Sequence, residues 1–181
     1  SLLGGSLFLA WNYFLIAYQK RRILTLFNPE SDPLGSGYHI IQSKIAIGSG
    51  GFTGKGIEKG SQSQLDFVPE QSTDFIFSVL AEELGFLGVL LLIIIYSLII
   101  YRCLILSLRC EDNFSRLLGA SLTFVFFTYI FVNIGMVSGL LPVVGVPLPL
   151  ISYGGSSLIT LMASFGIIMS IHKHKGPRYL Q

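Results

Sequence analysis

The chain has 181 residues, of which 51% are hydrophobic and only 12% are charged, and its mean hydropathy is +0.68. An ordinary soluble domain carries about twice that share of charged residues, so the composition excludes this class and indicates a membrane protein. The net charge is only +2 and the twelve Lys and Arg residues are scattered, which argues against nucleic acid as a partner.

Residues 1–18 have no charge and carry aromatic side chains suited to a membrane interface, so they predict a first transmembrane helix. Because the chain opens inside this apolar run, we expect it to be the C-terminal part of a longer protein. Residues 19–73 are predicted to form a long aqueous loop. This loop opens with a basic amphipathic piece, QKRRILTLF, which suits the membrane surface, and continues with turn signals and many glycines.

The glycine-rich part of this loop, IGSGGFTGKGIEKG, invites comparison with phosphate-binding loops. Its spacing fits neither the Walker pattern nor GxGxxG. Backbone amides together with Lys55 or Lys59 can still hold a pyrophosphate without those fingerprints. The sequence leaves two interpretations open, a pyrophosphate-binding loop and a simple flexible loop.

The stretch DFVPEQSTDFIFSVLAEELG, residues 66–85, joins a polar acidic loop to an apolar helix. Ser72 or Thr73 is the predicted N-cap, and the helix is expected to begin near Asp74. Asp74 can be a catalytic carboxylate, or it can simply stabilise the helix dipole by about 0.3–1 kcal/mol. Glu82 and Glu83 follow inside the apolar part, where a carboxylate needs a partner, a wet cavity or a function. Adjacent helical residues point about 100° apart, so these two cannot both face the same neighbour.

Hydropathy and charge predict the rest of the chain as three spans joined by short connections. The predicted units are a transmembrane helix at 74–101, a charged loop at 102–116, a helix at 117–138, a Pro/Gly hairpin at 139–149, a helix at 150–171 and a basic tail at 172–181. Basic residues near the span ends place the 102–116 loop and the tail in the cytoplasm. The 19–73 loop and the hairpin then lie outside. Cys103 and Cys110 are expected to be free thiols, because seven helical residues separate them by about 10 Å.

Four long motifs together resemble one known family. QSKIAIGSGG, PEQSTDFIFSVLAEELG, NIGMVSGLLPVVGVPLPLISYGGSS and the tail IHKHK are similar to the SEDS family of bacterial cell-wall polymerases, and to its RodA-like branch in particular. The resemblance covers nearly the whole chain. It implies an all-α polytopic membrane fold of about ten spans, of which this chain would be the last four, with a long extracellular loop.

The resemblance also implies a function. Family members are peptidoglycan glycosyltransferases of the bacterial inner membrane that polymerise lipid II into glycan strands, here during cell elongation and rod-shape maintenance. Their expected partners are a class B penicillin-binding protein transpeptidase and the membrane proteins of the elongation complex. The family's essential Asp falls on Asp74 and its second loop carboxylate, usually Glu, falls on Asp66. A basic residue from the family's N-terminal half is absent, so this chain alone is expected to be inactive.

The chemistry of the reaction suits these residues. Lipid II carries an α-linked pyrophosphate and the product bond is β, so the displacement inverts the anomeric carbon and needs a base on the attacking 4-hydroxyl. Asp74 is the predicted general base. Lys44, Lys55, or a divalent ion (magnesium or manganese) held by Asp66 or Asp74 would stabilise the leaving pyrophosphate, and whether any metal cofactor is used stays open.

Further residues are predicted to contact the lipid-linked substrate, namely Glu82, Ser152, Gly154 and Gly155. The small residues 154–157 would let helices approach closely and line a groove for the polyprenyl tail, although plain helix packing explains each serine equally well. Two other functions remain as alternatives. One is a flippase for lipid II that uses Glu82 and Glu83 as polar steps through the bilayer. The other is a non-catalytic scaffold of the cell-wall synthesis complex.

Overall fold

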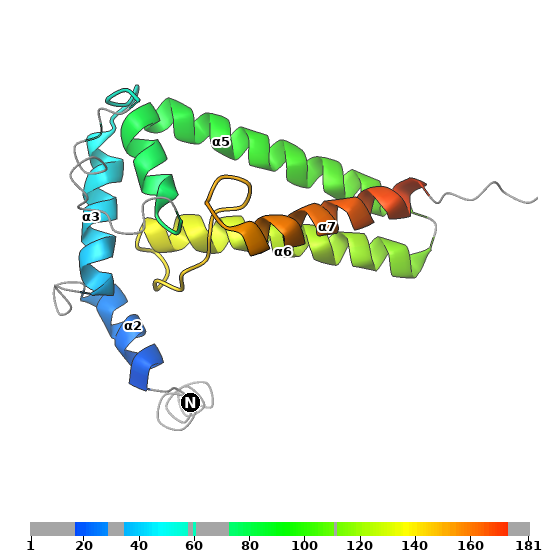
Figure 1. Cartoon of the computed structure of the whole chain (residues 1–181), viewed down its shortest axis with the longest axis horizontal. Helices are drawn as coiled ribbons and strands as arrows, with labels where there is room; N and C mark the ends of the chain where they lie inside the picture. Colours follow the sequence, from blue (N-terminus) through cyan, green and yellow to red (C-terminus); the bar gives the residue numbers. More distant parts are fainter. Residues whose placement is uncertain (1–16, 29–34, 58–59, 61–72, 111, 174–181) are drawn as a thin grey trace, which may run out of the picture.

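The computed structural model describes residues 17–28, 35–57, 60, 73–110 and 112–173, and the regular elements in this part of the chain are all helices, with no strand. The helices are α2 (Ala17–Phe27), α3 (Ser36–Ser49), α5 (Ile76–Leu108), α6 (Asn113–Val137) and α7 (Gly155–Lys173). Helices α5, α6 and α7 run lengthwise beside one another, while α2 and α3 cross one end of this bundle (Figure 1).

The bundle has the properties of a membrane domain. Helices α5 and α6, with 33 and 25 residues, are long and apolar enough to cross a bilayer, and the apolar part of α7, Gly155–Ile171, is shorter. The outer faces of α5 and α6 expose large apolar side chains, as lipid-facing surfaces do. Leu91, Leu98, Phe124 and Phe131 are examples. The predicted all-α membrane fold is confirmed, whereas the first predicted span lies outside the described residues apart from its last two positions.

The boundaries of the spans differ from those predicted. Helix α5 runs seven residues past 101 to Leu108, because the single Arg102 side chain is exposed and does not interrupt the helical hydrogen bonds. Helix α6 begins at Asn113 rather than at 117, so the predicted 102–116 loop shrinks to a short turn. Helix α7 begins at Gly155 rather than at 150, because the chain turns through Leu150, whose φ is +67°.

The segment predicted as a long aqueous loop, residues 19–73, contains helix α3, which the sequence analysis did not predict. This helix has 14 residues and packs against both α5 and α6. Ile40, Ser43 and Ala46 are spaced by three residues and are all buried, so they form the inward face of α3. Helix α2 matches the predicted amphipathic piece, and its Leu24 and Phe27 are exposed, as a helix on a membrane surface requires.

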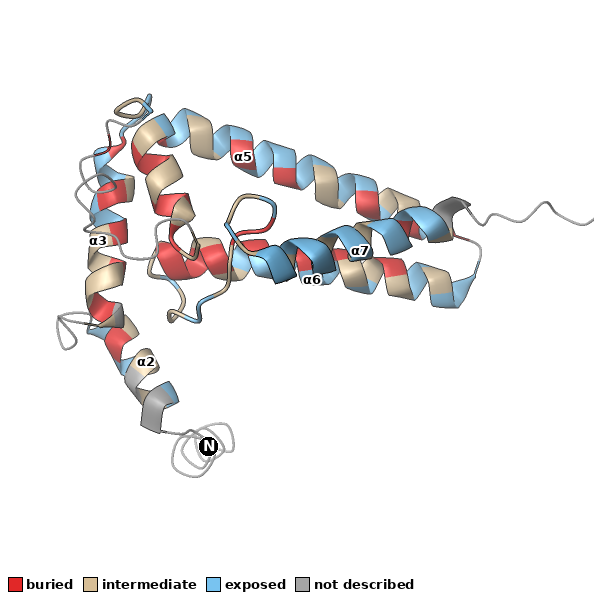
Figure 2. Ribbon diagram, viewed as in Figure 1, coloured by how far each residue is buried: buried red, intermediate tan, exposed pale blue. Residues whose placement is uncertain are grey.

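The hydrophobic core lies at the end of the bundle that α3 covers. Phe75, Phe77, Phe126, Met136 and Val137 belong to one buried cluster there. Figure 2 shows buried residues gathered on the facing sides of α3, α5 and α6 at this end, while α7 is mostly exposed. The core therefore holds the loops at this end against the helices.

Candidate active site

Helix α5 is broken near its start. Gly85 has φ +66° and ψ −162°, values that end a helix, and residues 76–84 turn sharply away from the long part that follows (Figure 1). The first helical residue is Ile76 and the N-cap is Phe75, without a side-chain cap, so the predicted cap at Ser72 or Thr73 was wrong. Asp74 therefore lies in the turn that precedes a short, separate helical arm, residues 76–84.

Two side chains from other elements hold the turn that carries Asp74. Asn133 on α6 donates its amide hydrogens to the carbonyl oxygens of Asp74 at 2.9 Å and of Val146 at 2.7 Å. The Ser152 hydroxyl donates to the carbonyl oxygen of Thr73 at 2.6 Å and accepts from the Leu148 amide at 2.7 Å. These bonds join the turn to the segment between α6 and α7, so the backbone of Asp74 is fixed from two sides.

The Asp74 side chain faces Gly145. A Cβ built on that glycine would lie 3.1 Å from Asp74 Oδ2, and Gly145 has φ +76°. The carboxylate is half-buried beside a backbone that has no side chain. The side chain of Asp74 therefore lies close to the backbone of the segment that connects α6 to α7.

Lys44 is the basic residue that α3 brings to the same end of the bundle. A Cβ built on Gly139, which follows α6 directly, would lie 2.6 Å from Lys44 Nζ. The adjacent Ser43 donates a hydrogen bond to the carbonyl oxygen of Val137 at 3.0 Å, which fixes this part of α3 against the end of α6. Lys44 thus lies beside the start, and Asp74 beside the middle, of the segment that connects α6 to α7.

Glu82 and Lys55, both predicted to contact substrate, form an ion pair with each other. Lys55 Nζ lies 2.7 Å from Glu82 Oε1, and the Glu82 side chain is completely buried. Ser49 also approaches this carboxylate oxygen at 3.5 Å. Glu82 therefore has an ion-pair partner, as a carboxylate inside an apolar helix needs.

The glycine-rich loop packs on the break in α5. We call residues 50–57 the kink loop. Its Lys55 and Gly56 amides donate to the carbonyl oxygens of Glu82 and Glu83, at 3.1 and 3.0 Å. In return, the amides of Phe86 and Leu87 donate to the carbonyl oxygens of Gly51 and Phe52, at 2.9 and 3.1 Å. These bonds satisfy backbone groups that the break at Gly85 deprives of helical partners.

Sterics explain the glycines of the kink loop. A Cβ on Gly50 would clash with the carbonyl oxygen of Ala81, and one on Gly54 would clash with that of Glu83. Since the Lys55 and Gly56 amides are already bonded to α5, they are not available to a phosphate. These glycines thus allow close packing of the loop against α5.

The residues predicted to contact the lipid-linked substrate, Ser152, Gly154 and Gly155, differ in how closely other atoms pack against them. Ser152 bonds within the protein, and Gly154 allows close approach of Ser157, whose hydroxyl oxygen would lie 2.6 Å from a Cβ at that position. No heavy atom lies within 4 Å of a Cβ built on Gly155, so the expected close packing at this glycine is absent from the described residues.

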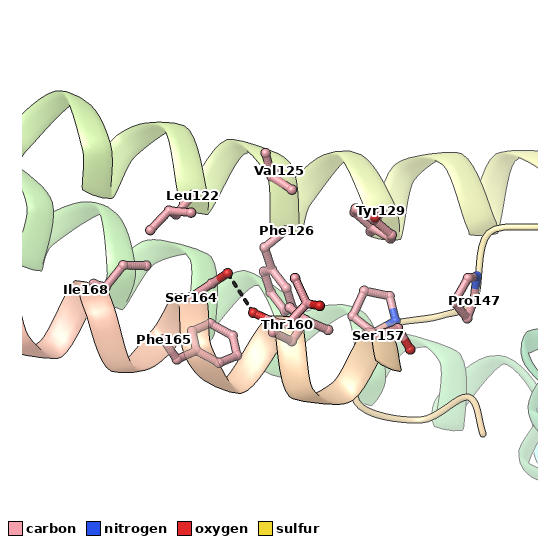
Figure 3. A pocket seen from close by; sticks show the side chains of 12 residues that line it. Leu122, Val125, Phe126, Tyr129, Pro147, Ser157, Thr160, Ser164, Phe165 and Ile168 are labelled. Carbon is pink, nitrogen blue, oxygen red and sulfur yellow. Dashed lines mark hydrogen bonds between the residues drawn. The ribbon is translucent and has the colours of Figure 1, made fainter. Parts of the chain in front are cut away.

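A cavity lies beside this segment, between α6 and α7 (Figure 3). Ser157, Thr160 and Ser164 contribute hydroxyls to its wall, but each donates to a carbonyl oxygen of the turn before it. The other lining side chains are mostly apolar, and they include Leu122, Val125, Phe126, Tyr129, Pro147, Phe165 and Ile168. The cavity therefore suits an apolar group.

Asp66 lies outside the described residues. Among the residues that the structure does describe, no three His, Cys, Asp or Glu side chains gather to hold a metal ion. Cys103 and Cys110 are both free, as predicted.

The sequence analysis missed Asn133, Gly145 and Ser43, which shape the surroundings of Asp74 and Lys44. The only sequence signal for Asn133 was a strongly polar amide inside a charge-free span. Gly145 was one glycine among several in the hairpin, with nothing local to distinguish it.

Comparison with known proteins gives consistent matches. A family model named for FtsW, RodA and SpoVE, and described as cell cycle protein, matches residues 2–176. The peptidoglycan glycosyltransferase MrdB of Escherichia coli strain K12 is 61% identical over 165 residues, which cover 91% of this chain and 45% of that protein. The peptidoglycan glycosyltransferase RodA of Treponema pallidum is 46% identical over 155 residues, 86% of this chain and 36% of that protein. The chain thus spans less than half the length of these relatives.

Two solved structures share the fold. A chain from a peptidoglycan synthase complex, studied for its coordination of polymerization and crosslinking, matches 99% of this chain and 48% of its own length. The TM-score is 0.76 and the identity is 34%. The crystal structure of a mutant of the Thermus thermophilus rod shape determining protein RodA matches 94% of this chain and 59% of its own, with a TM-score of 0.57 and 29% identity.

Proposed function

Because this chain belongs to the FtsW/RodA/SpoVE family of cell cycle proteins, we propose that it acts as a peptidoglycan glycosyltransferase that polymerises lipid II into glycan strands during cell elongation. Relatives named as peptidoglycan glycosyltransferases support this proposal. The observation that carries it is the setting of Asp74. Its backbone turn is held by Asn133 and Ser152 at one end of a membrane bundle, and the side chain of this half-buried residue faces Gly145.

In the proposed reaction, the 4-hydroxyl oxygen of one saccharide attacks the anomeric carbon of another, and the bond to the pyrophosphate oxygen breaks. Asp74 accepts the hydroxyl proton as the new bond forms, and the polyprenyl pyrophosphate leaves with the electron pair. Lys44 on α3 lies beside Gly139, at the start of the segment whose Gly145 faces Asp74, so we assign to it the stabilisation of charge on the leaving group. Lys55 is not assigned this role, because its amine neutralises Glu82.

The cavity between α6 and α7 supports a place for an apolar part of the substrate (Figure 3). Its wall includes Pro147 and Ser157, which flank the short segment that contains Ser152 and Gly154. We assign part of the polyprenyl tail to this cavity. The reacting sugars would then lie at the Asp74 end of the same segment.

The proposed location is the bacterial cytoplasmic (inner) membrane, with the C-terminus in the cytoplasm and Asp74 on the outer side. The proposed partners are a class B penicillin-binding protein transpeptidase and other membrane proteins of the elongation complex. The solved complex that couples polymerization with crosslinking supports a transpeptidase partner.

A magnesium or manganese ion held by Asp66 or Asp74 stays a prediction. Among the described residues no three His, Cys, Asp or Glu side chains gather to hold a metal ion, and Asp66 lies outside these residues.

The transport alternative relies on Glu82 and Glu83 as polar steps through the bilayer. The buried Glu82 carboxylate is paired with Lys55 at 2.7 Å, which favours a structural role for it. A scaffold without catalysis would not require a fixed Asp74. The glycosyltransferase function therefore explains more features of the site than the transport or the scaffold function does.

The decisive experiment measures glycan polymerisation from purified lipid II by the full-length protein with its transpeptidase partner, comparing wild type with Asp74→Asn. Asn keeps the shape and the backbone contacts but removes the base. We expect the turnover rate of Asp74→Asn to fall by about 10²–10⁴-fold, the usual contribution of general base catalysis.

The matched control is Asp112→Asn. Asp112 is an exposed carboxylate before α6, at the opposite end of the bundle, so the same chemical change there should leave polymerisation unchanged. An undiminished rate for folded Asp74→Asn would refute its role as base, and a lipid II flipping assay would then test the transport alternative.

A further inference from the structure

The arm of α5 that follows Asp74 is held at both ends. At one end, Asn133 and Ser152 bind the turn at residues 73–74. At the other end, the kink loop covers the break at Gly85 through four backbone hydrogen bonds. The Lys55–Glu82 ion pair adds a side-chain bond at this second end.

Because the arm is short and rigid, its angle at Gly85 affects the position of Asp74 at the other end. Asp74 lies eleven positions before Gly85, and the helical arm between them, residues 76–84, is about 14 Å long at 1.5 Å per residue. A tilt of about 4° at Gly85 would therefore move the Asp74 end by about 1 Å, and a misplacement of that size can cost about 100-fold in rate. A helix broken at a glycine has little stiffness of its own at the break, so external contacts must set this angle.

We propose that the kink loop is a clamp that sets the angle of the helical arm, and that Lys55 and Glu82 are positioning residues which place Asp74 for reaction. This inference rests on the proposed function. Neither side chain touches the substrate in this assignment. Movement of α3, which leads directly into the kink loop, would be transmitted through the clamp to Asp74.

The packing supports a clamp more than a binding loop. The Glu82 side chain is completely buried, and it faces the loop rather than an open cavity. Gly50 and Gly54 touch backbone oxygens of the arm so closely that neither position can carry a side chain. On the far side of the break, the Phe52 and Phe86 rings lie 5.8 Å apart in an edge-on arrangement. The loop thus contacts both halves of α5.

The first test uses the ion pair. Lys55→Met leaves the buried Glu82 charge without its partner, whereas the neutral pair Lys55→Met/Glu82→Gln removes both charges and keeps the shape. Breaking a buried pair is damaging, but replacing both partners is often tolerated. We expect kcat for lipid II polymerisation to fall about tenfold or more in Lys55→Met, with KM within about threefold of wild type, and to recover to at least about half in the neutral pair.

A lysine that binds pyrophosphate predicts a different result. KM would then rise in Lys55→Met, and removal of Glu82 would not restore activity. A folded neutral pair as inactive as Lys55→Met would therefore overturn the positioning role. If Lys55→Met does not accumulate as folded protein, the activity of the neutral pair is the test. An active neutral pair supports the positioning role, and an inactive folded one overturns it.

The second test uses sterics without any change in charge. Gly50→Ala places a methyl group against the carbonyl oxygen of Ala81 and should push the kink loop off the arm. Gly50 has φ −70°, so alanine adds no backbone strain there. Gly48→Ala is the matched control, because a Cβ two residues earlier meets no atom within 4 Å.

We expect kcat to fall about tenfold or more in Gly50→Ala, while the melting temperature of the helical bundle stays unchanged. In Gly48→Ala, kcat should stay at the wild-type level. Equal activity of the two folded variants would overturn the clamp. Wild type and Asp74→Asn are measured in the same assay. Failure of the wild type to polymerise would count against the proposed function, whereas an active wild type with insensitive clamp variants would count against the clamp alone.

Discussion

Asn133 donates a hydrogen bond from its side-chain amide to the backbone carbonyl oxygen of Asp74, at 2.9 Å. The same amide group binds the carbonyl oxygen of Val146 at 2.7 Å, so one buried side chain on α6 joins the proposed base to the segment that faces it. The backbone of Asp74 and the segment that contains Gly145 are thereby held relative to each other. The following predictions test this arrangement.

Asn133→Leu keeps nearly the same volume and removes both donors. Two buried carbonyl oxygens lose their partners, which costs about 1–3 kcal/mol each in the free energy of unfolding. Because Asp74 then loses one of its two anchors, kcat for polymerisation should fall about 10- to 100-fold with little change in KM. Steady-state kinetics on lipid II, with a thermal melt of the same sample, measure both effects.

Thr128→Val is the control for this change, since it removes an exposed hydroxyl from the same helix. It should have wild-type kinetics. If Asn133→Leu kept the wild-type kcat, the amide would not be needed to place Asp74.

Gly145→Ala tests the open side of the carboxylate. Gly145 has φ +76°, a conformation that costs an L-residue about 1–2 kcal/mol, and the new methyl group would lie 3.1 Å from Asp74 Oδ2. We expect weaker lipid II binding and a slower reaction, because the methyl group occupies the approach to the base. Gly166→Ala on α7 adds the same group in open space and should be neutral. Equal kinetics of the two variants would show that the reactant approaches Asp74 from elsewhere.

Ser152→Ala removes the second anchor of the turn. The variant leaves the carbonyl oxygen of Thr73 and the amide of Leu148 without this hydroxyl, at a cost of about 1–3 kcal/mol in the free energy of unfolding. The melting temperature and kcat should fall together. Ser152→Thr, which keeps the hydroxyl, should restore most of the activity, and Ser97→Ala on the exposed face of α5 should change neither quantity. Full activity of Ser152→Ala would assign the anchoring to Asn133 alone.

Lys44→Gln tests the proposed stabilisation of the leaving pyrophosphate. Loss of one charged donor from the transition state typically costs about 10²–10³ in kcat. Lys44→Arg keeps the charge and should retain more activity than Lys44→Gln does. Arg102→Gln, an exposed charge farther along α5, serves as the control and should behave as wild type. If Lys44→Gln turned over lipid II at the control's rate, the cation would have to come from another part of the protein.

The predictions that succeeded from sequence depend on local composition. The membrane class, the apolar helices α5 and α6 and the free cysteines follow from hydropathy and spacing, because a bilayer selects each helix by its own residues. Asp74 could also be singled out, since a carboxylate between a polar loop and an apolar helix stands out in the chain itself. The family resemblance reinforced that choice.

Only the tertiary structure decided what surrounds Asp74. Lys55 and Glu82 are 27 positions apart, and Asn133 lies 59 positions from the residue it holds, so no local pattern relates them. The glycine-rich loop was ambiguous for the same reason. The sequence left a pyrophosphate-binding loop and a flexible loop both open. In the structure the loop packs on the backbone of α5 at Gly85, because a broken helix exposes amides and carbonyls that must find partners within the fold.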